Sequence, residues 1–297
     1  MKSNRVRAVL AFAVVLTLCG ALPLGAQDNS PTRERLRVVD SSKVQIITIH
    51  DGSSLVGRIS AVRTDSLDFE TRMGRVTVAI ADVREIVETD ARKMRGGQYW
   101  FPNPNTTRLF FAPTGQMLKK GEGYFADYQL FFPGVAYGLT DNVSIGGGVS
   151  LFPAGLDEQV YYLTPKIGKS FGENVHLAAG VLFVGFMGGG SNGTGGVGYG
   201  VGTLGDGDGS VTMGLGYGFA GGEIESKPVA MVGGEKRVSR RIALVTENYL
   251  LPVSENNVVY SFGLRFMGER LTTDLAIFNV SGSNIIGLPF VDFVFKF

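Results

Sequence analysis

Histidine, cysteine and clustered carboxylates are the residues from which most active sites and metal sites are built, and this chain has few of them. It holds two histidines, His50 and His176, and one cysteine, Cys19, in 297 residues. A serine hydrolase needs a nucleophile, a base and a group that orients the base, and no serine stands in a recognisable motif with His176. We therefore predict no catalytic residues, no cofactor and no metal site, and keep an envelope enzyme as the third hypothesis for function.

Two glycine-rich runs invite a ligand interpretation that their sequences do not support. Residues 188–196 lack the Gly-Lys-Ser/Thr ending of a phosphate-binding loop, and no helical pattern follows them. The run Asp206-Gly207-Asp208-Gly209 lacks the spacing and the terminal glutamate of a calcium loop. We interpret the first run as an outer loop and the second as a hairpin turn.

Composition excludes several other classes. The chain has 43 glycines, about double the ordinary ~7% share, with 44% hydrophobic and 19% charged residues. The formal net charge is +1, so no electrostatic footprint for nucleic acid is present. Wholesale disorder is also excluded, because the apolar content is sufficient for a folded core.

The first 26 residues have the pattern of a secretory signal peptide. Lys2, Arg5 and Arg7 precede a short apolar core, and Gly25-Ala26 offers a cleavage site. The core is too short for a membrane-spanning helix, which needs about 20 apolar residues. A lipoprotein, with Cys19 as the lipidated residue, is the alternative. An exported chain without later apolar helices crosses a membrane with strands if it crosses one at all.

Residues 44–89 predict a small periplasmic β-domain. Alternating apolar residues and turn signals, such as Asp51-Gly52, divide it into five short strands. With Gly57 in the second strand, the pattern resembles an Sm-like or SH3-like barrel over residues 44–88. Residues 27–43 are expected to be a flexible lead-in and 90–100 a linker. The expected strands are Val44–His50, Ser54–Val62, Ser66–Thr71, Arg75–Ile80 and Val83–Val87.

Residues 101–297 alternate between large apolar residues and small or charged residues. This period of two, with short turns alternating with longer ones, is typical of a transmembrane antiparallel β-barrel with an apolar exterior. A soluble periplasmic all-β protein is the alternative fold. We expect about twelve strands, with ten or fourteen open because 123–139 is long and contains Pro133-Gly134. The expected strands are 106–115, 123–139, 142–153, 159–171, 174–187, 196–205, 209–221, 227–238, 241–252, 257–267, 270–279 and 288–297.

The face opposite the apolar one carries charges of both signs, which we predict to line the lumen. Such residues either tune the passage of solutes or pair in a closed interior, and both interpretations stay open. The aromatic run Tyr99–Phe101 is expected at the periplasmic interface. The predicted lumen-lining residues are Arg108, Asp127, Lys166, Glu235, Glu247, Arg265, Asp274, Asp292 and Lys296.

The last strand carries an apolar residue at every second position to the end of the chain. Val291, Phe293, Phe295 and Phe297 resemble the C-terminal signal of bacterial outer-membrane barrels, which implies recognition by the barrel-assembly machinery. Segment 103–148, with Asn103–Arg108, Lys119–Tyr124 and Tyr137–Asn142, resembles a group of uncharacterised Gram-negative outer-membrane proteins, loosely up to the C-terminus. This resemblance implies location and fold but no mechanism.

The sequence therefore predicts an outer-membrane barrel among lipids, with its N-terminal domain in the periplasm. Its function is expected to be a narrow channel for ions or small solutes. The alternative is a closed structural barrel that anchors the small domain, which would bind an unidentified periplasmic partner.

Overall fold

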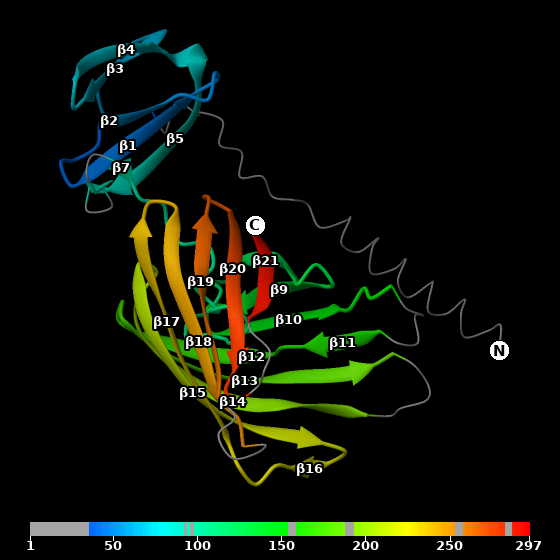
Figure 1. Cartoon of the computed structure of the whole chain (residues 1–297). Coiled ribbons are helices and arrows are strands. Elements are labelled where there is room, and N and C mark those ends of the chain that lie inside the picture. Colours follow the sequence, from blue (N-terminus) through cyan, green and yellow to red (C-terminus); the bar gives the residue numbers. More distant parts are fainter. Residues whose placement is uncertain are drawn as a thin grey trace, which may run out of the picture. The chain divides into compact units, whose positions relative to one another are not determined.

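The computed structural model describes residues 36–91, 94–95, 98–153, 159–187, 193–252, 258–282 and 287–297. The predicted signal peptide lies outside these residues. The chain divides into two compact units, Met1–Trp100 and Phe101–Phe297, and each is described by itself (Figure 1).

The first unit is a five-stranded antiparallel sheet in the order β4-β3-β2-β1-β5. All five predicted strands are confirmed, with ends shifted by at most three residues. Ile47, Ile59, Leu67 and Phe69 fill its core. Whether the unit belongs with Sm-like domains stays a prediction. Its elements are β1 (Lys43–Ile49), β2 (Ser54–Val62), β3 (Ser66–Thr71), β4 (Gly74–Ala79), the short 3-10 helix η1 (Ile80–Asp82) and β5 (Val83–Asp90), followed by the two-residue strands β6 (Met94–Arg95) and β7 (Gln98–Tyr99).

The end of the expected lead-in packs on this unit, which differs from the sequence-based expectation. Leu36 is buried in the core, and Arg37 pairs with Glu88 at 3.1 Å. The buried Gln45 side chain donates to the Arg37 carbonyl at 2.9 Å and accepts from the Ile59 amide at 2.8 Å. A polar composition suggested flexibility, but one leucine and one buried amide side chain are enough to order residues 36–42.

The second unit is a closed antiparallel barrel of twelve strands. The ladder runs from β8 through consecutive neighbours to β21, and pairing of β21 with β8 closes it. β11 and β12 are two parts of one strand, interrupted at Thr164-Pro165, because both pair with β10 and β13. The strands are β8 (Gly123–Tyr128), β9 (Phe132–Thr140), β10 (Val143–Val149), β11 (Val160–Leu163), β12 (Lys166–Phe171), β13 (Val175–Phe186), β14 (Thr194–Asp206), β15 (Gly209–Ala220), β17 (Val229–Ser239), β18 (Ile242–Leu250), β19 (Val258–Met267), β20 (Leu271–Val280) and β21 (Leu288–Lys296), with the two-residue strand β16 (Glu223–Ile224) on β15.

The number of strands agrees with the prediction, but two of the expected strands are wrong. Residues 106–115 form no barrel strand, and 123–139 are two strands that meet in a tight turn. Gln129 and Leu130 form this turn with φ of 55° and 64°, a region that residues other than glycine seldom adopt. The Gln129 side chain then bonds to the backbone of Pro289 and Val291, where the short β8 no longer pairs with β21.

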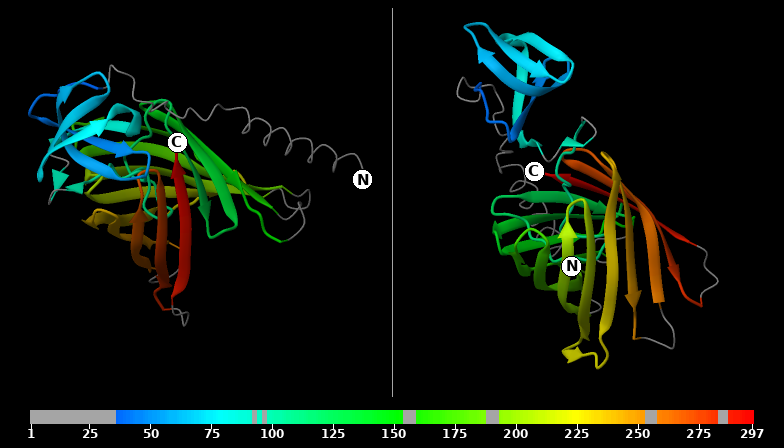
Figure 2. Two further views of the ribbon diagram at one scale, coloured as in Figure 1. Left: turned by 90° about the horizontal axis from the view of Figure 1, so that it is seen from above. Right: turned by 90° about the vertical axis from the view of Figure 1, so that its left-hand side faces the viewer.

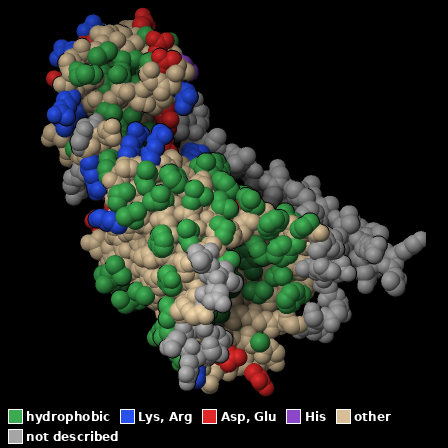
Figure 3. Space-filling model, viewed as in Figure 1, with side chains coloured by type: hydrophobic (Ala, Val, Ile, Leu, Met, Phe, Trp, Pro, Cys, Tyr) green, Lys and Arg blue, Asp and Glu red, His purple; other side chains and the backbone are tan. Residues whose placement is uncertain are grey.

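The exterior of the barrel is apolar, as a membrane-spanning barrel requires. On β19, exposed Tyr260, Phe262 and Leu264 alternate with buried Ser261 and Arg265. Hydrophobic side chains cover the barrel face shown in Figure 3. The green strands β9–β13 and the orange-to-red strands β19–β21 run in different directions as the sheet curls (Figure 2). Among the described residues, no helix is long and apolar enough to cross a membrane.

Candidate functional site: a filled lumen

Residues 101–122, which we call the lumenal segment, lie inside the barrel. Its side chains at Phe101, Asn105, Arg108, Leu109 and Phe110 are buried, although the segment contains no regular strand. It starts among the short turns, where the Phe101 carbonyl accepts a 2.7 Å bond from Arg237. It returns to the same end, where the Lys119 and Glu122 backbones lie beside Gly138. The segment therefore enters and leaves the lumen at the short-turn end.

Local sequence explains why this segment is a loop and not a strand. Pro102, Pro104 and Pro113 cannot donate to a ladder, and Asn103 Oδ1 accepts from the Asn105 amide at 3.0 Å, as in an Asx turn. Beyond it, Thr114 N donates to the Thr107 carbonyl at 3.0 Å. The result is a narrow loop whose tip is Leu109–Ala112.

One glutamate of the barrel wall holds the tip. Glu247 Oε2 accepts hydrogen bonds from the backbone N–H groups of Phe110, Phe111 and Ala112 at 2.8, 3.0 and 3.0 Å. Tyr249 donates to the other carboxylate oxygen at 2.6 Å. Three consecutive N–H groups that converge on one oxygen form an anion-binding backbone nest. A buried charge that lacks a cationic partner is costly, and here the nest stabilises it.

A cation of the barrel wall, Arg265, binds carbonyl groups of the same segment. Its guanidinium donates to the Asn105 and Leu109 carbonyls at 2.8 and 2.7 Å. It also binds Asp274 through two bonds of 2.8 and 2.7 Å and Glu235 through one of 2.6 Å. All five N–H donors of an arginine can be used only when a rigid set of acceptors surrounds it, so this residue joins β17, β19 and β20 to the lumenal segment.

A second buried ion pair joins the segment to the last strand. Arg108 Nη2 lies 2.6 Å from Asp292 Oδ2, Nη1 donates to the Phe110 carbonyl, and the guanidinium lies over the Tyr128 ring at 4.5 Å. Arg108 was expected on a barrel strand with its side chain in the lumen. The side chain is inside the barrel, but it comes from the lumenal segment and not from the wall.

Further contacts fix both ends of the segment. Near its start, the Asn103 amide bonds to Glu235 and to the Gly207 carbonyl. Near its end, Gly115 N donates to Thr203 at 2.8 Å, and Glu122 pairs with Lys296 at 3.2 Å.

The structure places most of the other predicted lumen residues on the inner face of the wall. Lys166, Glu235, Glu247, Arg265, Asp274 and Asp292 are buried there, and Lys296 is half-buried. Asp127 is the correction: it lies on the same face of β8 as exposed Phe125, while Ala126 is buried. The alternation was assigned the wrong way on this strand because its inward residues, Tyr124, Ala126 and Tyr128, are aromatic or apolar.

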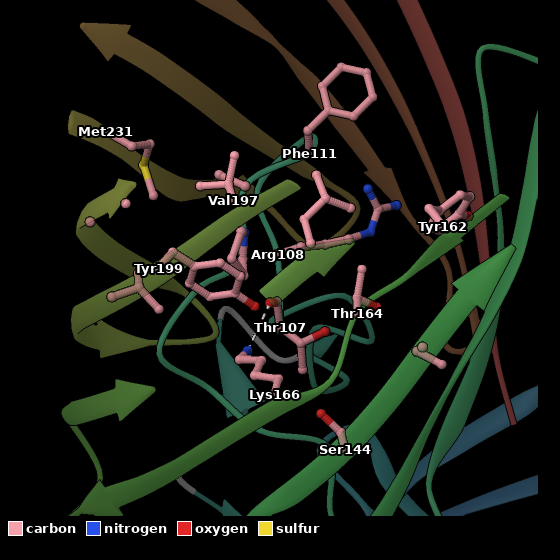
Figure 4. Close-up of a pocket in the computed structure, with 18 of the residues that line it drawn as sticks. Thr107, Arg108, Phe111, Ser144, Tyr162, Thr164, Lys166, Val197, Tyr199 and Met231 are labelled. Atoms are coloured by element: carbon pink, nitrogen blue, oxygen red, sulfur yellow. Dashed lines mark hydrogen bonds between the residues drawn. The ribbon is translucent and has the colours of Figure 1, made fainter. Parts of the chain in front are cut away.

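A cavity of about 530 Å³ remains beside the lumenal segment. It is lined by the backbone of glycines in β10, β14 and β15, by aromatic side chains and by two cations, Arg108 and Lys166. Figure 4 shows Phe111, Met231 and Val197 toward one side and Lys166, Thr164 and Ser144 toward the other. The cavity is therefore apolar on one side and polar on the other.

Sequence reasoning missed one constellation, a serine beside His176. Ser170 Oγ lies 2.7 Å from His176 Nδ1, and His176 Nε2 lies 3.2 Å from the Gly205 carbonyl. A carbonyl can only accept, so Nε2 donates to it, and in the neutral tautomer Nδ1 then accepts from the serine hydroxyl. The short turn 172–174 pairs the two residues across β12 and β13, and that register was a usable signal. Among the described residues, no carboxylate pairs with the imidazole as the third member of a hydrolase triad would.

The remaining predicted features are positioned as follows. Phe293, Phe295 and Phe297 are exposed on the outer face of β21, and Val291 is half-buried on the same face. Phe101, expected at an aromatic interface, instead lies against the Arg237 and Arg240 guanidiniums at 4.9 and 5.7 Å. No group of three or more potential metal ligands occurs among the described residues.

No known protein family and no curated protein matches the chain. Solved structures with a similar fold include the KdgM porin in complex with disordered oligogalacturonate, at 10% identity and a TM-score of 0.46, covering 59% of this chain and 98% of that one. The NanC porin covers 59% and 97% at 9% identity and a TM-score of 0.38. A loop-deletion mutant of OmpT, an outer membrane protein of Vibrio cholerae, covers 86% and 97% at 12% identity and a TM-score of 0.35. At these values the likenesses indicate nothing about solute or mechanism.

Proposed function

We propose that this protein is an outer-membrane β-barrel whose lumen is closed by residues 101–122 and which holds the small β-unit in the periplasm. This proposal rests on the hydrogen bonds that join Glu247 and Arg265 to the backbone of the lumenal segment. Wall residues of opposite sign bind the N–H groups and the carbonyls of the same loop. A solvated pore lining would leave these charges facing water.

The topology supports the proposed orientation. An even number of strands returns both ends of the barrel to one side, and bacterial barrels have their short turns in the periplasm. Here the short turns, the start of β8 and the end of β21 share one end of the barrel. The small unit, which precedes the barrel in the chain, would then be periplasmic, where an unidentified partner would bind it.

Conductance measurements test the closure. The mature chain, folded in planar bilayers, should give no discrete openings, whereas a variant lacking residues 103–121 should conduct. Heat-dependent gel mobility of both samples confirms that each barrel is folded. Stable, ion-selective openings of the complete chain would contradict the proposal.

A narrow channel that opens when the lumenal segment moves is the second candidate. The cavity beside the segment favours it, because about 530 Å³ of the lumen is not filled by protein. Openings of the complete chain that depend on voltage or on an added solute would favour this candidate over a permanently closed anchor.

A further inference from the structure

We propose that the cavity beside the lumenal segment is a binding site for a small amphipathic anion, a molecule with an aromatic or branched apolar body and one carboxylate. The proposal needs the barrel and the position of the lumenal segment, but it does not depend on whether the barrel conducts.

The size and lining of the cavity suit a small molecule. Ligand pockets have volumes of about 300–1,000 Å³ and are mostly apolar with a few polar groups, and this one has about 530 Å³. Phe111, at the tip of the lumenal segment, lines this cavity and is 49% exposed although it lies inside the barrel. An apolar ring turned toward a cavity provides a surface that an apolar ligand body can cover.

Glycines of the wall leave room for the side chains, including two tyrosines, that line the cavity. Tyr162 lies over Gly134 and Gly148 of the neighbouring strands, where a Cβ atom would come within 2.1 and 2.5 Å of its hydroxyl oxygen. Gly216, opposite Tyr199 in the ladder, is equally required, because a Cβ there would lie 2.8 Å from Val197. Larger residues at these positions would displace the side chains that line the cavity.

The polar side of the cavity has more hydrogen-bond donors than the protein uses. Lys166, 9% exposed, donates to the Gln116 carbonyl at 2.6 Å and lies 3.4 Å from the Thr107 carbonyl. An ammonium has three N–H donors, so one has no acceptor among the residues that the structure describes. Arg108 Nε and Tyr162 Oη are buried without a hydrogen-bond partner among the described residues.

Charge favours an anion over a neutral acceptor. Arg108 and Arg265 have carboxylate partners in the lumen, whereas Lys166 forms no ion pair with a described residue and its Nζ donates to two backbone carbonyls. A carboxylate from a ligand would supply the missing counter-charge. Thr164 and Ser144, which also line this side of the cavity (Figure 4), could donate to its second oxygen.

The test compares two probes of nearly equal shape. Full-length mature protein in zwitterionic nanodiscs is titrated with 2-naphthoate and with neutral 2-naphthamide, and empty nanodiscs are subtracted. We expect saturable binding of the carboxylate, at least about tenfold weaker binding of the amide, and a similar loss for the carboxylate in Lys166→Met, because a hydrogen bond between two charged groups is stronger than one to a neutral group. Lys236→Met, which removes an exposed lysine of β17 that does not line the cavity, should bind like the wild type.

A second pair of variants tests the location. Gly214 lines the cavity, and the atom nearest to an added Cβ there is 3.3 Å away, so Gly214→Leu places a side chain in the cavity. Gly198 does not line the cavity, and no atom lies within 4 Å of an added Cβ there. Gly214→Leu should abolish binding and Gly198→Leu should leave it unchanged. Equal binding of both probes, wild-type binding by Lys166→Met, or undiminished binding by folded Gly214→Leu would overturn the proposal. Conductance is measured separately, so failure here would leave the proposed closure standing.

Discussion

Glu247 is the wall residue whose removal should release the lumenal segment. In Glu247→Leu, three buried N–H groups at Phe110, Phe111 and Ala112 lose their common acceptor. A buried donor left unpaired costs about 1–3 kcal/mol, and a tip that moves into water avoids this cost. At about 1 kcal/mol for each donor, the closed state loses about 3 kcal/mol, which raises the released fraction by about 100-fold.

The same substitution also removes the cost of burying the carboxylate, and this effect stabilises the closed state. Glu247 is fully buried and forms no ion pair with a described residue, so leucine also removes a charge that was expensive to bury. Leucine, however, accepts no hydrogen bond, and relief of that burial gives the three N–H groups no new partner. Glu247→Gln keeps an acceptor oxygen at this position, so its effect should be smaller than that of leucine.

Cysteine labelling measures the release directly. Ala112→Cys at the buried tip, combined with Cys19→Ser in the predicted leader, reports access of a water-soluble maleimide to the lumen. We expect the labelling rate to rise by one to two orders of magnitude in Glu247→Leu, less in Glu247→Gln, and not at all in Glu223→Leu, whose glutamate is exposed. A wild-type labelling rate in a folded Glu247→Leu barrel would refute the closure mechanism.

Three further predictions concern stability. Arg265→Met leaves Asp274 and Glu235 buried without their cation, so the barrel should lose about 3–5 kcal/mol and unfold at lower temperature in heat-mobility gels; an unchanged transition would contradict this. In the small unit, burial acts to raise the pKa of the Asp68 carboxyl, but hydrogen bonds from Thr77 and Arg63 outweigh it and hold the pKa below its usual value. The stabilisation of the small unit by the ionised Asp68 is therefore present above the unfolded pKa of about 3.9 and is lost as the pH falls through the lower folded value. Asp68→Asn should weaken the acid dependence of amide protection in β3. Hydrogen exchange, corrected for intrinsic rates, measures this protection. Gly57→Ala brings a Cβ within 2.0 Å of the Glu70 carbonyl oxygen and should reduce amide protection throughout the small sheet, whereas Gly198→Ala, with open space around it, should not change the barrel.

Most strands of the barrel, and most residues on the inner face of its wall, can be predicted from the alternation of residue types along the chain. A period of two distinguishes an outer from an inner face residue by residue, and short turns set the register, so Arg265 and Asp274 could be expected on one face and are direct neighbours in the ladder. Asp127 shows the limit of this rule, because aromatic residues such as Tyr124 and Tyr128 suit a lumen cavity as well as a lipid surface.

The segment that fills the lumen could not be predicted from any local pattern in the chain. Residues 106–115 look like a strand because Leu109, Phe110 and Phe111 are apolar, yet Pro104 and Pro113 prevent a ladder and the wall closes without them. Their backbone groups pair with Glu247 and Arg265, which are more than 130 positions away in the chain. A local sequence pattern cannot predict such a contact. The charged residues of distant strands lie next to one loop only because the twelve strands close around the lumenal segment.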